Sequence, residues 1–322
     1  MATKDAGQLQ RFTVGAADGG QRVDQWVARR LGVPRTRARA LVTAGLVRVD
    51  GRAAAPARRL RPGQLVTVVS PPPVTGPCPE IPILYADEAI AVVDKPAGLA
   101  VHPAGSTGGP TVVGCLAAEL GLAGGSPGRP GVVHRLDALT SGVLLLARAD
   151  DAYRGLVTQF RHRQVRKDYL AVVDGAVEVA EGEVRGRLAR DRRRPWRVEV
   201  SAMGKDAATT FWLVKAAGRQ TLLLVRPHTG RTHQIRVHLA AAGFPVVGDP
   251  LYGRGQGRLM LHALRLGFYH PRAGGWREVE APPPPEFLPW LGEGSRPRPE
   301  SSPPPPPRTG RAPMEKPGGT PR

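Results

Sequence analysis

A polar loop directly before an unbroken apolar run most constrains how this chain can fold. Residues 142–147 read GVLLLA, a pattern typical of a strand covered on both faces. Residues 131–133 (GVV) predict a second short strand, and HRLDALTSG (134–142) connects the two. The loop puts the carboxylate of Asp137 beside the cation of Arg135. We expect chemistry there, although an aspartate before Thr-Ser-Gly is also a common turn or capping residue.

A second polar motif, RPHTGRTHQIRVHL (226–239), continues from the apolar strand TLLLV. Its Thr-Gly pair predicts a turn, and the following residues predict a helix that Gly243 ends as a carboxyl cap. Arg231 and Arg236 lie near the start of this helix. An arginine of this motif placed against Asp137 would favour the charged form of the carboxylate.

Together the two motifs resemble the signature of the RluA-type pseudouridine synthases, which isomerise uridine within RNA. The resemblance covers residues 81–291 almost continuously through four further segments, DKPAGLAVHP, GKDAATTF, VVGDPLYG and LMLHALRLGF. It implies an α+β fold with a long, bent, mixed and mainly antiparallel sheet, flanking helices, and an active cleft across the middle of the sheet. It implies no cofactor and no metal.

The resemblance also assigns roles by position. Asp137, the fourth residue of HRLD, is the catalytic aspartate, and Arg236 of HQIR is the arginine beside it. Tyr169, in RKDYLAVV, packs on the base and helps to remove the proton at the new carbon bond. The residues implied to bind substrate or to shape its pocket are Arg135, which holds the flipped arrangement, His134, Lys95, Arg231, His233 and Gln234.

Plainer interpretations stay open for several of these residues. A strand tyrosine such as Tyr169 commonly belongs to a core. Lys95 can equally be a cation at the end of a strand. His233 and His238 can be hydrogen-bonded polar groups inside a packed helix.

The reaction breaks the bond between a base nitrogen and the sugar, turns the uracil, and rejoins it through carbon. Positive charge develops at the anomeric carbon, and one ionised carboxylate can stabilise it or capture it covalently. Whether Asp137 attacks the sugar or removes a sugar proton stays open. The target base must leave its stack, which costs a few kcal/mol.

The first 70 residues predict a separate basic unit, with thirteen Lys or Arg against four Asp and no Glu. Apolar spacing predicts a helix from Val23 to Leu31 and a second from Arg35 to Thr43, and Asp50-Gly51 predicts a hairpin turn. Residues 20–70 resemble an S4-type RNA-binding domain, after an amino-terminal extension (1–19). The predicted phosphate contacts are Arg35, Arg37 and Arg39. A solvated cationic helix face is the alternative.

Proline divides the rest of the chain. We predict a proline-rich linker at 71–80, a catalytic domain at 81–292 and a disordered tail at 293–322, since residues 281–322 hold fifteen of the 34 prolines. The tail is either passive or bound by a proline-recognising partner. Two cysteines, Cys78 and Cys115, suggest neither a zinc site nor a disulfide framework. With no signal peptide or apolar span, we expect a cytoplasmic monomer without a membrane or an obligate protein partner.

The net charge of +19 indicates a polyanionic partner, although a solubilising surface or an arginine-rich genome composition would give the same charge. We expect structured RNA, namely large-subunit ribosomal RNA of the 23S type rather than transfer RNA. Ala138 and Leu139 depart from the charged residues of many large-subunit-modifying relatives. Two rivals remain: a non-catalytic RNA-binding or ribosome-assembly factor on the same fold, and a nuclease, which normally needs clustered carboxylates.

Overall fold

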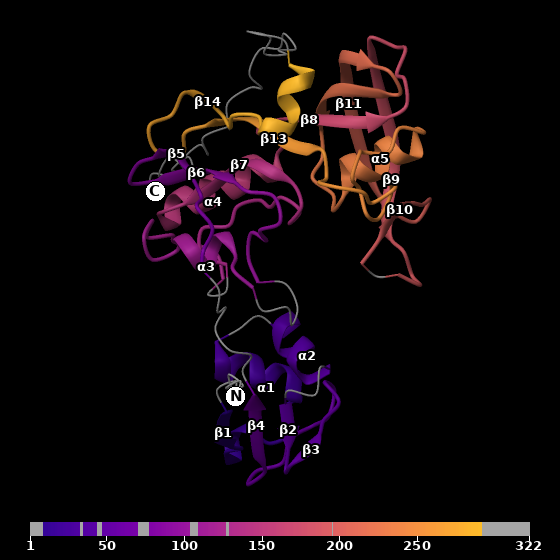
Figure 1. Cartoon of the computed structure of the whole chain (residues 1–322). Coiled ribbons are helices and arrows are strands. Elements are labelled where there is room, and N and C mark those ends of the chain that lie inside the picture. The colour runs from indigo at the N-terminus through magenta and orange to yellow at the C-terminus, as the bar shows by residue number, and fades with distance from the viewer. Residues whose placement is uncertain are drawn as a thin grey trace, which may run out of the picture.

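The computed structural model describes residues 9–32, 35–43, 47–69, 77–103, 109–126, 129–194 and 196–291. Figure 1 shows a small sheet near the amino terminus and a long sheet formed by the later residues. The predicted linker is described only from residue 77, and the predicted tail lies outside the described residues. No helix in the described ranges is long and apolar enough to cross a membrane.

The small unit has the helices and the hairpin that the sequence predicts. Its elements are β1 (Leu9–Thr13), the short 3-10 helix Ala16–Asp18, α1 (Val23–Leu31), α2 (Arg35–Thr43), β2 (Val47–Val49), β3 (Arg52–Ala53) and β4 (Leu65–Val69). The strand order is β1-β4-β2-β3. Asp50 and Gly51 both have positive φ between β2 and β3, which is the backbone of a tight hairpin turn.

Strand β1 corrects the predicted amino-terminal extension. It lies within residues 1–19, yet it pairs antiparallel with β4 from Leu9↔Val69 to Thr13↔Leu65. Apolar side chains from the helices and the sheet, including the fully buried Trp26, form one core. The small unit therefore starts at least as early as Leu9. Its first strand is too short and too polar for periodicity to reveal it.

The long sheet has ten strands in the order β10-β9-β11-β12-β8-β13-β7-β6-β5, with β14 paired to β13. Among the described strands, β13 and β7 are the one parallel pair, so the predicted mixed, mainly antiparallel α+β class is confirmed. The elements are β5 (Ile83–Ala86), β6 (Ile90–Lys95), α3 (Val112–Leu116), β7 (Ser141–Ala147), α4 (Asp150–Arg161), β8 (Arg166–Asp174), β9 (Glu181–Arg190), β10 (Val198–Val200), β11 (Lys205–Ala217), β12 (Gln220–Pro227), α5 (Gln234–Ala241), β13 (Leu261–Tyr269), β14 (Trp276–Glu280) and the 3-10 helix Pro285–Trp290.

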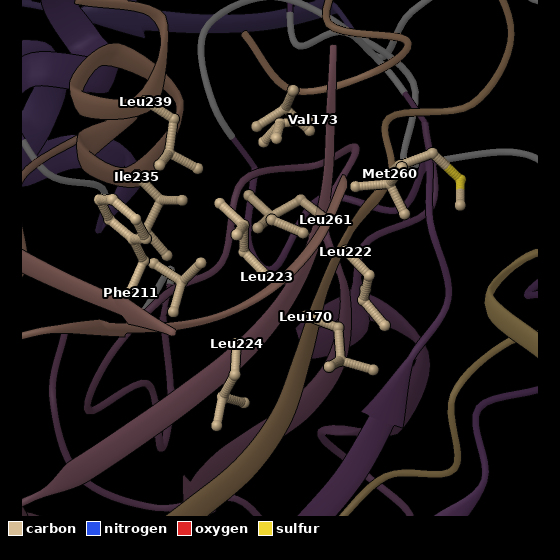
Figure 2. Packing of buried hydrophobic residues seen from close by; sticks show 14 of the residues in the cluster. Leu170, Val173, Phe211, Leu222, Leu223, Leu224, Ile235, Leu239, Met260 and Leu261 are labelled. Atoms are coloured by element: carbon tan, nitrogen blue, oxygen red, sulfur yellow. The ribbon is translucent and has the colours of Figure 1, made fainter. Parts of the chain in front are cut away.

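Helix α5 is held against the sheet by apolar packing. Ile235 and Leu239 are four residues apart, so they lie on one face of the helix. Figure 2 shows them beside Phe211 of β11 and the leucines of β12, with residues of β8 and β13 in the same cluster. Nearly every side chain of α5 is buried, and its orientation is therefore fixed by the core. Gly243, with a positive φ, follows the end of this helix as expected.

The prediction of a strand at residues 131–133 is wrong. This described stretch makes only an isolated bridge from Val132 to Leu146, while β7 is completely buried as predicted. The loop is held by individual hydrogen bonds: the N–H of Ala147 donates to Gly131, and the N–H of Gly98 donates to Ala138. Single hydrogen bonds and one isolated bridge, rather than continuous strand pairing, therefore hold the loop against β7.

The two cysteines did not suggest a disulfide in the sequence, and this expectation is wrong, because Cys78 and Cys115 form one. It links the segment before β5 to α3, with the two Cα atoms 5.7 Å apart. The cysteines are 37 positions apart in sequence, a separation that does not indicate their proximity in space. The topology of the sheet, not the spacing, brings them together.

Gly142, at the start of β7, provides a test of how this loop enters the sheet. It has φ of 111°, and a Cβ there would overlap the backbone of Ala263 on the parallel neighbour β13. We expect Gly142→Ala to destabilise the chain by at least about 2 kcal/mol in thermal or urea unfolding. Gly218→Ala is the matched control, because Gly218 also has positive φ but a Cβ added there would meet no atom within 4 Å. A loss no larger than that of the control would contradict the close approach of β7 and β13.

Candidate active site

A cavity of about 510 Å³ lies where the HRLD loop, β8 and the segment before α5 meet. This volume is in the usual range for small-ligand sites. Its lining includes Asp137, Tyr169 and Arg236, the three residues predicted to be catalytic. Asp137 and Arg236, which are 99 positions apart in sequence, thus lie on one cavity wall.

Asp137 is fixed by both its backbone and its carboxylate. Its carbonyl accepts the N–H of Thr140, which closes a turn. Its side chain is 18% exposed, and Oδ2 accepts a hydrogen bond from Nη1 of Arg236 at 3.1 Å. The carboxylate therefore combines access to the cavity with a fixed cationic partner.

Arg236 is oriented by a second carboxylate that sequence reasoning did not assign. Nε and Nη2 of Arg236 donate to the two oxygens of Asp249 at 2.7 and 2.8 Å, a bidentate pair. Asp249 is fully buried and also accepts the N–H groups of Leu251 and Tyr252. Burial raises the pKa of Asp249, but the hydrogen bonds and charge of Arg236 outweigh it and lower that pKa overall. The fork leaves Nη1 for Asp137.

Tyr169 lines the same cavity from β8 and is half-buried. Burial, followed by the negative charges of Asp137 and Asp168, raises the pKa of its hydroxyl. The side chain is therefore a neutral phenol at neutral pH. Lys167 lies two positions earlier on the strand, so it points to the same face and also lines the cavity.

His134 and Arg135 differ in what they can do. Nε2 of His134 accepts the N–H of Leu145, and its ring stacks on Phe160 with centroids 4.7 Å apart. Burial lowers the pKa of His134 to about 3, so it is neutral and fastens the loop to β7. Arg135 is exposed, lines the cavity, and has no hydrogen bond or ion pair with any described residue.

His233 precedes α5 in the left-handed conformation, with φ of 55°. Its Nδ1 is 3.0 Å from the hydroxyl of Tyr252, and its Nε2 is 3.9 Å from Oδ2 of Asp137. Burial lowers the pKa of His233 although Asp137 opposes the shift. The neutral ring thus lies between the hydroxyl of Tyr252 and the carboxylate of Asp137.

Gln234 lines the cavity, but its amide is fully used inside the protein, which favours shaping of the pocket over contact with the substrate. Its oxygen accepts from the hydroxyl of Thr229 and the N–H of Arg231, and its nitrogen donates to Ala208 and Thr209. Gln234 therefore shapes the turn before α5. Arg231 lines the cavity, and its Nε donates to the carbonyl of Asp206.

The prediction that Lys95 lines the substrate pocket is wrong, because Lys95 is fully buried and is not among the cavity-lining residues. Its ammonium group donates to three carbonyls, those of Pro96, Leu99 and Ala138, at 2.8 to 2.9 Å. The strand-end interpretation is the correct one. Through Ala138, the residue after Asp137, Lys95 holds the loop in place.

The sequence reasoning missed three cations that line the cavity, Arg161, Arg163 and Lys167. Nζ of Lys167 donates to the carbonyl of Thr229, and burial lowers its pKa to about 8. The sequence signal for Lys167 was its spacing from Tyr169: residues two positions apart on a strand point to the same face. For Asp249 the signal was its place in VVGDPLYG, a segment that the resemblance already included.

In the small unit, the three predicted phosphate-binding arginines lie on α2 but differ in their surroundings. Arg35 donates twice to the buried carboxylate of Asp24, at 3.2 Å each, so part of its charge is neutralised within the protein. Arg39 is exposed. The side chain of Arg37 lies outside the described part of the structure.

The fold and the site together define a class of protein. Residues 89–241 match the RNA pseudouridylate synthase family, and residues 21–66 match the S4 domain. An uncharacterized RNA pseudouridine synthase of Aquifex aeolicus is 41% identical over 305 residues, which cover 85% of this chain and 95% of the relative. The chain belongs to the RNA pseudouridine synthase family. This confirms the class of enzyme and the amino-terminal module that the motifs predict.

Two further similarities agree with this membership. Ribosomal large subunit pseudouridine synthase D of Xanthomonas campestris is 40% identical over 272 residues, covering 78% of this chain and 81% of that protein. The structure of human RNA pseudouridylate synthase domain containing 1 aligns with a TM-score of 0.55 and 26% identity, covering 68% of this chain and 90% of the human one.

The buried Lys95 predicts a pH dependence of stability. Burial lowers its pKa from 10.5 to about 7. Between these values the unfolded chain binds a proton that the folded chain does not, so stability rises as pH increases from about 7 to 10. Lys95→Met should remove a slope of up to about 1.4 kcal/mol per pH unit in urea unfolding across this window. Lys205→Met, at an exposed lysine, is the control. Parallel curves for wild type and Lys95→Met would contradict the assignment.

Proposed function

We propose that this chain converts uridine to pseudouridine in structured RNA, specifically in large-subunit ribosomal RNA, and that Asp137 is the catalytic carboxylate. The observation that carries the proposal is the contact between Asp137 and Arg236 on the wall of a nucleotide-sized cavity. Arg236 supplies a fixed positive charge 3.1 Å from the carboxylate that the chemistry needs.

The number of carboxylates in the cavity suits an isomerase. Asp137 is the single acidic residue among the described residues that line it. Hydrolysis of glycosides normally uses two carboxylates, one of which protonates the leaving group. Uracil leaves the sugar as a stabilised anion, so one carboxylate suffices, whether it attacks the anomeric carbon or removes a sugar proton. The nitrogen–sugar bond breaks and a carbon–sugar bond forms. The proton lost from that carbon is balanced by one gained at the freed nitrogen, so the product is an isomer of uridine.

Cations around the cavity suit an everted nucleotide. Arg135, Arg161, Arg163, Lys167 and Arg231 all line it and can contact phosphates on either side of the target. Extruding the base costs a few kcal/mol, which such contacts can offset. The exposed Arg135, unpaired among the described residues, is suited to occupy the space that the base leaves. The neutral phenol of Tyr169 favours packing on the base over removal of its proton.

Three observations support large-subunit ribosomal RNA as the substrate. Several relatives carry names that specify the large ribosomal subunit. The chain has a net charge of +19, which favours a long polyanion. The S4 domain adds a basic module that positions RNA rather than reading its sequence. No protein partner is needed for this account, and a cytoplasmic monomer stays the expectation.

Asp137→Asn tests the proposed role with almost no change in volume. We expect pseudouridine formation on an unmodified large-subunit RNA transcript to fall at least about 10³-fold, because an amide can neither stabilise the developing charge nor capture it. RNA affinity should stay within about twofold, since a phosphate-binding surface remains. Wild-type activity should persist in chelator, which separates the isomerase from a metal-dependent nuclease. Substantial activity of Asp137→Asn would refute the assignment, and inactive wild type that binds RNA would favour the assembly-factor alternative.

A further inference from the structure

Strands β9 and β10 and the turns beside them form a projection that the catalytic account does not use. We define the basic arm as residues 185–194 and 196–206, which hold eight Arg or Lys and three acidic side chains. Strand β10 is the edge strand of the long sheet, and Figure 1 shows the turn between β9 and β10 projecting away from that sheet. The arm is therefore available to a partner at one end of the sheet.

The turn at the tip of the arm is ordered by a buried carboxylate. Asp191 accepts the N–H groups of Arg193 and Arg194, and its own N–H donates to the carbonyl of Arg197. Asp191 is buried, whereas Arg192 and Arg193 are exposed and form no ion pair with any described residue. A fixed turn thus presents two unneutralised cations to solvent.

Beside these cations stands an aromatic side chain that the fold does not bury. Trp196 is 64% exposed, and the exposed Val200 and Met203 lie on the same arm. An exposed aromatic ring among arginines is the combination that binds unpaired nucleotides, because each base stacks on a ring while phosphates meet the cations. An acidic protein would also be attracted by charge, but it has no specific use for the indole face.

The arm contacts residues that line the cavity or pack behind its lining. The N–H of Val198 donates to the hydroxyl of Tyr252 at 2.9 Å, and that hydroxyl is 3.0 Å from Nδ1 of His233. The guanidinium of Arg197 lies over the ring of Tyr252. Arg231, a cavity residue, donates to the carbonyl of Asp206 at the end of the arm. The arm therefore adjoins the wall of the cavity that would hold the target nucleotide.

We propose that the basic arm is a second RNA-contact surface, where Trp196 stacks on an unpaired base flanking the target and Arg192 and Arg193 contact the adjacent phosphates. The proposal rests on the proposed function, because the same RNA strand must occupy the cavity. It predicts that the arm acts on substrate binding and not on the chemical step. Changes in the arm should therefore raise KM and leave kcat nearly unchanged.

Binding of the full-length chain to an unmodified large-subunit RNA transcript and to polyuridylate tests the arm. We expect Trp196→Ala to weaken binding about 5- to 100-fold, because base stacking on a ring is lost. Trp196→Phe should recover most of the affinity. The double variant Arg192→Ala, Arg193→Ala should lower the slope of log Kd against log salt by about 1.4 on the single-stranded probe. Leu288→Ala is the matched control, because Leu288 is 57% exposed outside the arm.

The possible outcomes distinguish a failure of the arm proposal from a failure of the proposed isomerase function. Because binding is measured without turnover, weaker binding by Trp196→Ala supports the arm even if wild type forms no pseudouridine. Unchanged RNA affinity and salt slope in both arm variants, with wild type active, would overturn the arm and leave the proposed function intact. Polyglutamate serves as a probe for acidic proteins. If the arm variants bind polyglutamate more weakly than wild type but keep the wild-type affinity for RNA, the arm proposal is also overturned, in favour of an acidic protein partner. Unchanged melting temperatures would establish that the variants remain folded.

Discussion

The guanidinium of Arg236 lies between two carboxylates, and the arrangement of the site depends on it. A buried charge is costly unless it is paired and hydrogen-bonded, and Asp249 supplies that pairing through both of its oxygens. The remaining Nη1 then donates to Asp137. Because the packing of Ile235 and Leu239 fixes α5, the hydrophobic core of the sheet determines where the catalytic carboxylate meets its cation.

A single acid among several cations is the second constraint that joins fold to function. Such a cavity attracts the phosphates of a polyanion while retaining one carboxylate for the sugar. The S4 domain precedes the site residues in the sequence, and the basic arm lies between the two motifs that form the site. The roles that we propose are divided between buried and exposed arginines: Arg236 lies inside the protein, whereas Arg135, Arg192 and Arg193 face solvent.

The sequence predicts much of this because the main elements carry local signals. Apolar spacing indicates α1 and α2, the Thr-Gly turn indicates the start of α5, and the two motifs together indicate that Asp137 meets Arg236. Which polar side chains turn inward could not be predicted. Lys95 and Gln234 look like substrate ligands in sequence, but each also donates to a group far along the chain, the carbonyl of Ala138 and that of Ala208 respectively. Burial of such groups depends on topology, as does the pairing of Cys78 with Cys115.

The central claim is that Asp137, held by Arg236, isomerises uridines of ribosomal RNA in this cavity. Pseudouridine mapping at single-nucleotide resolution tests it most directly, in large-subunit RNA from cells that lack the chain and from the same cells supplied with wild type or with Asp137→Asn. The account predicts that defined pseudouridines disappear without the chain, return with wild type and do not return with the variant. An identical map in all the cells, or full restoration by Asp137→Asn, would contradict it.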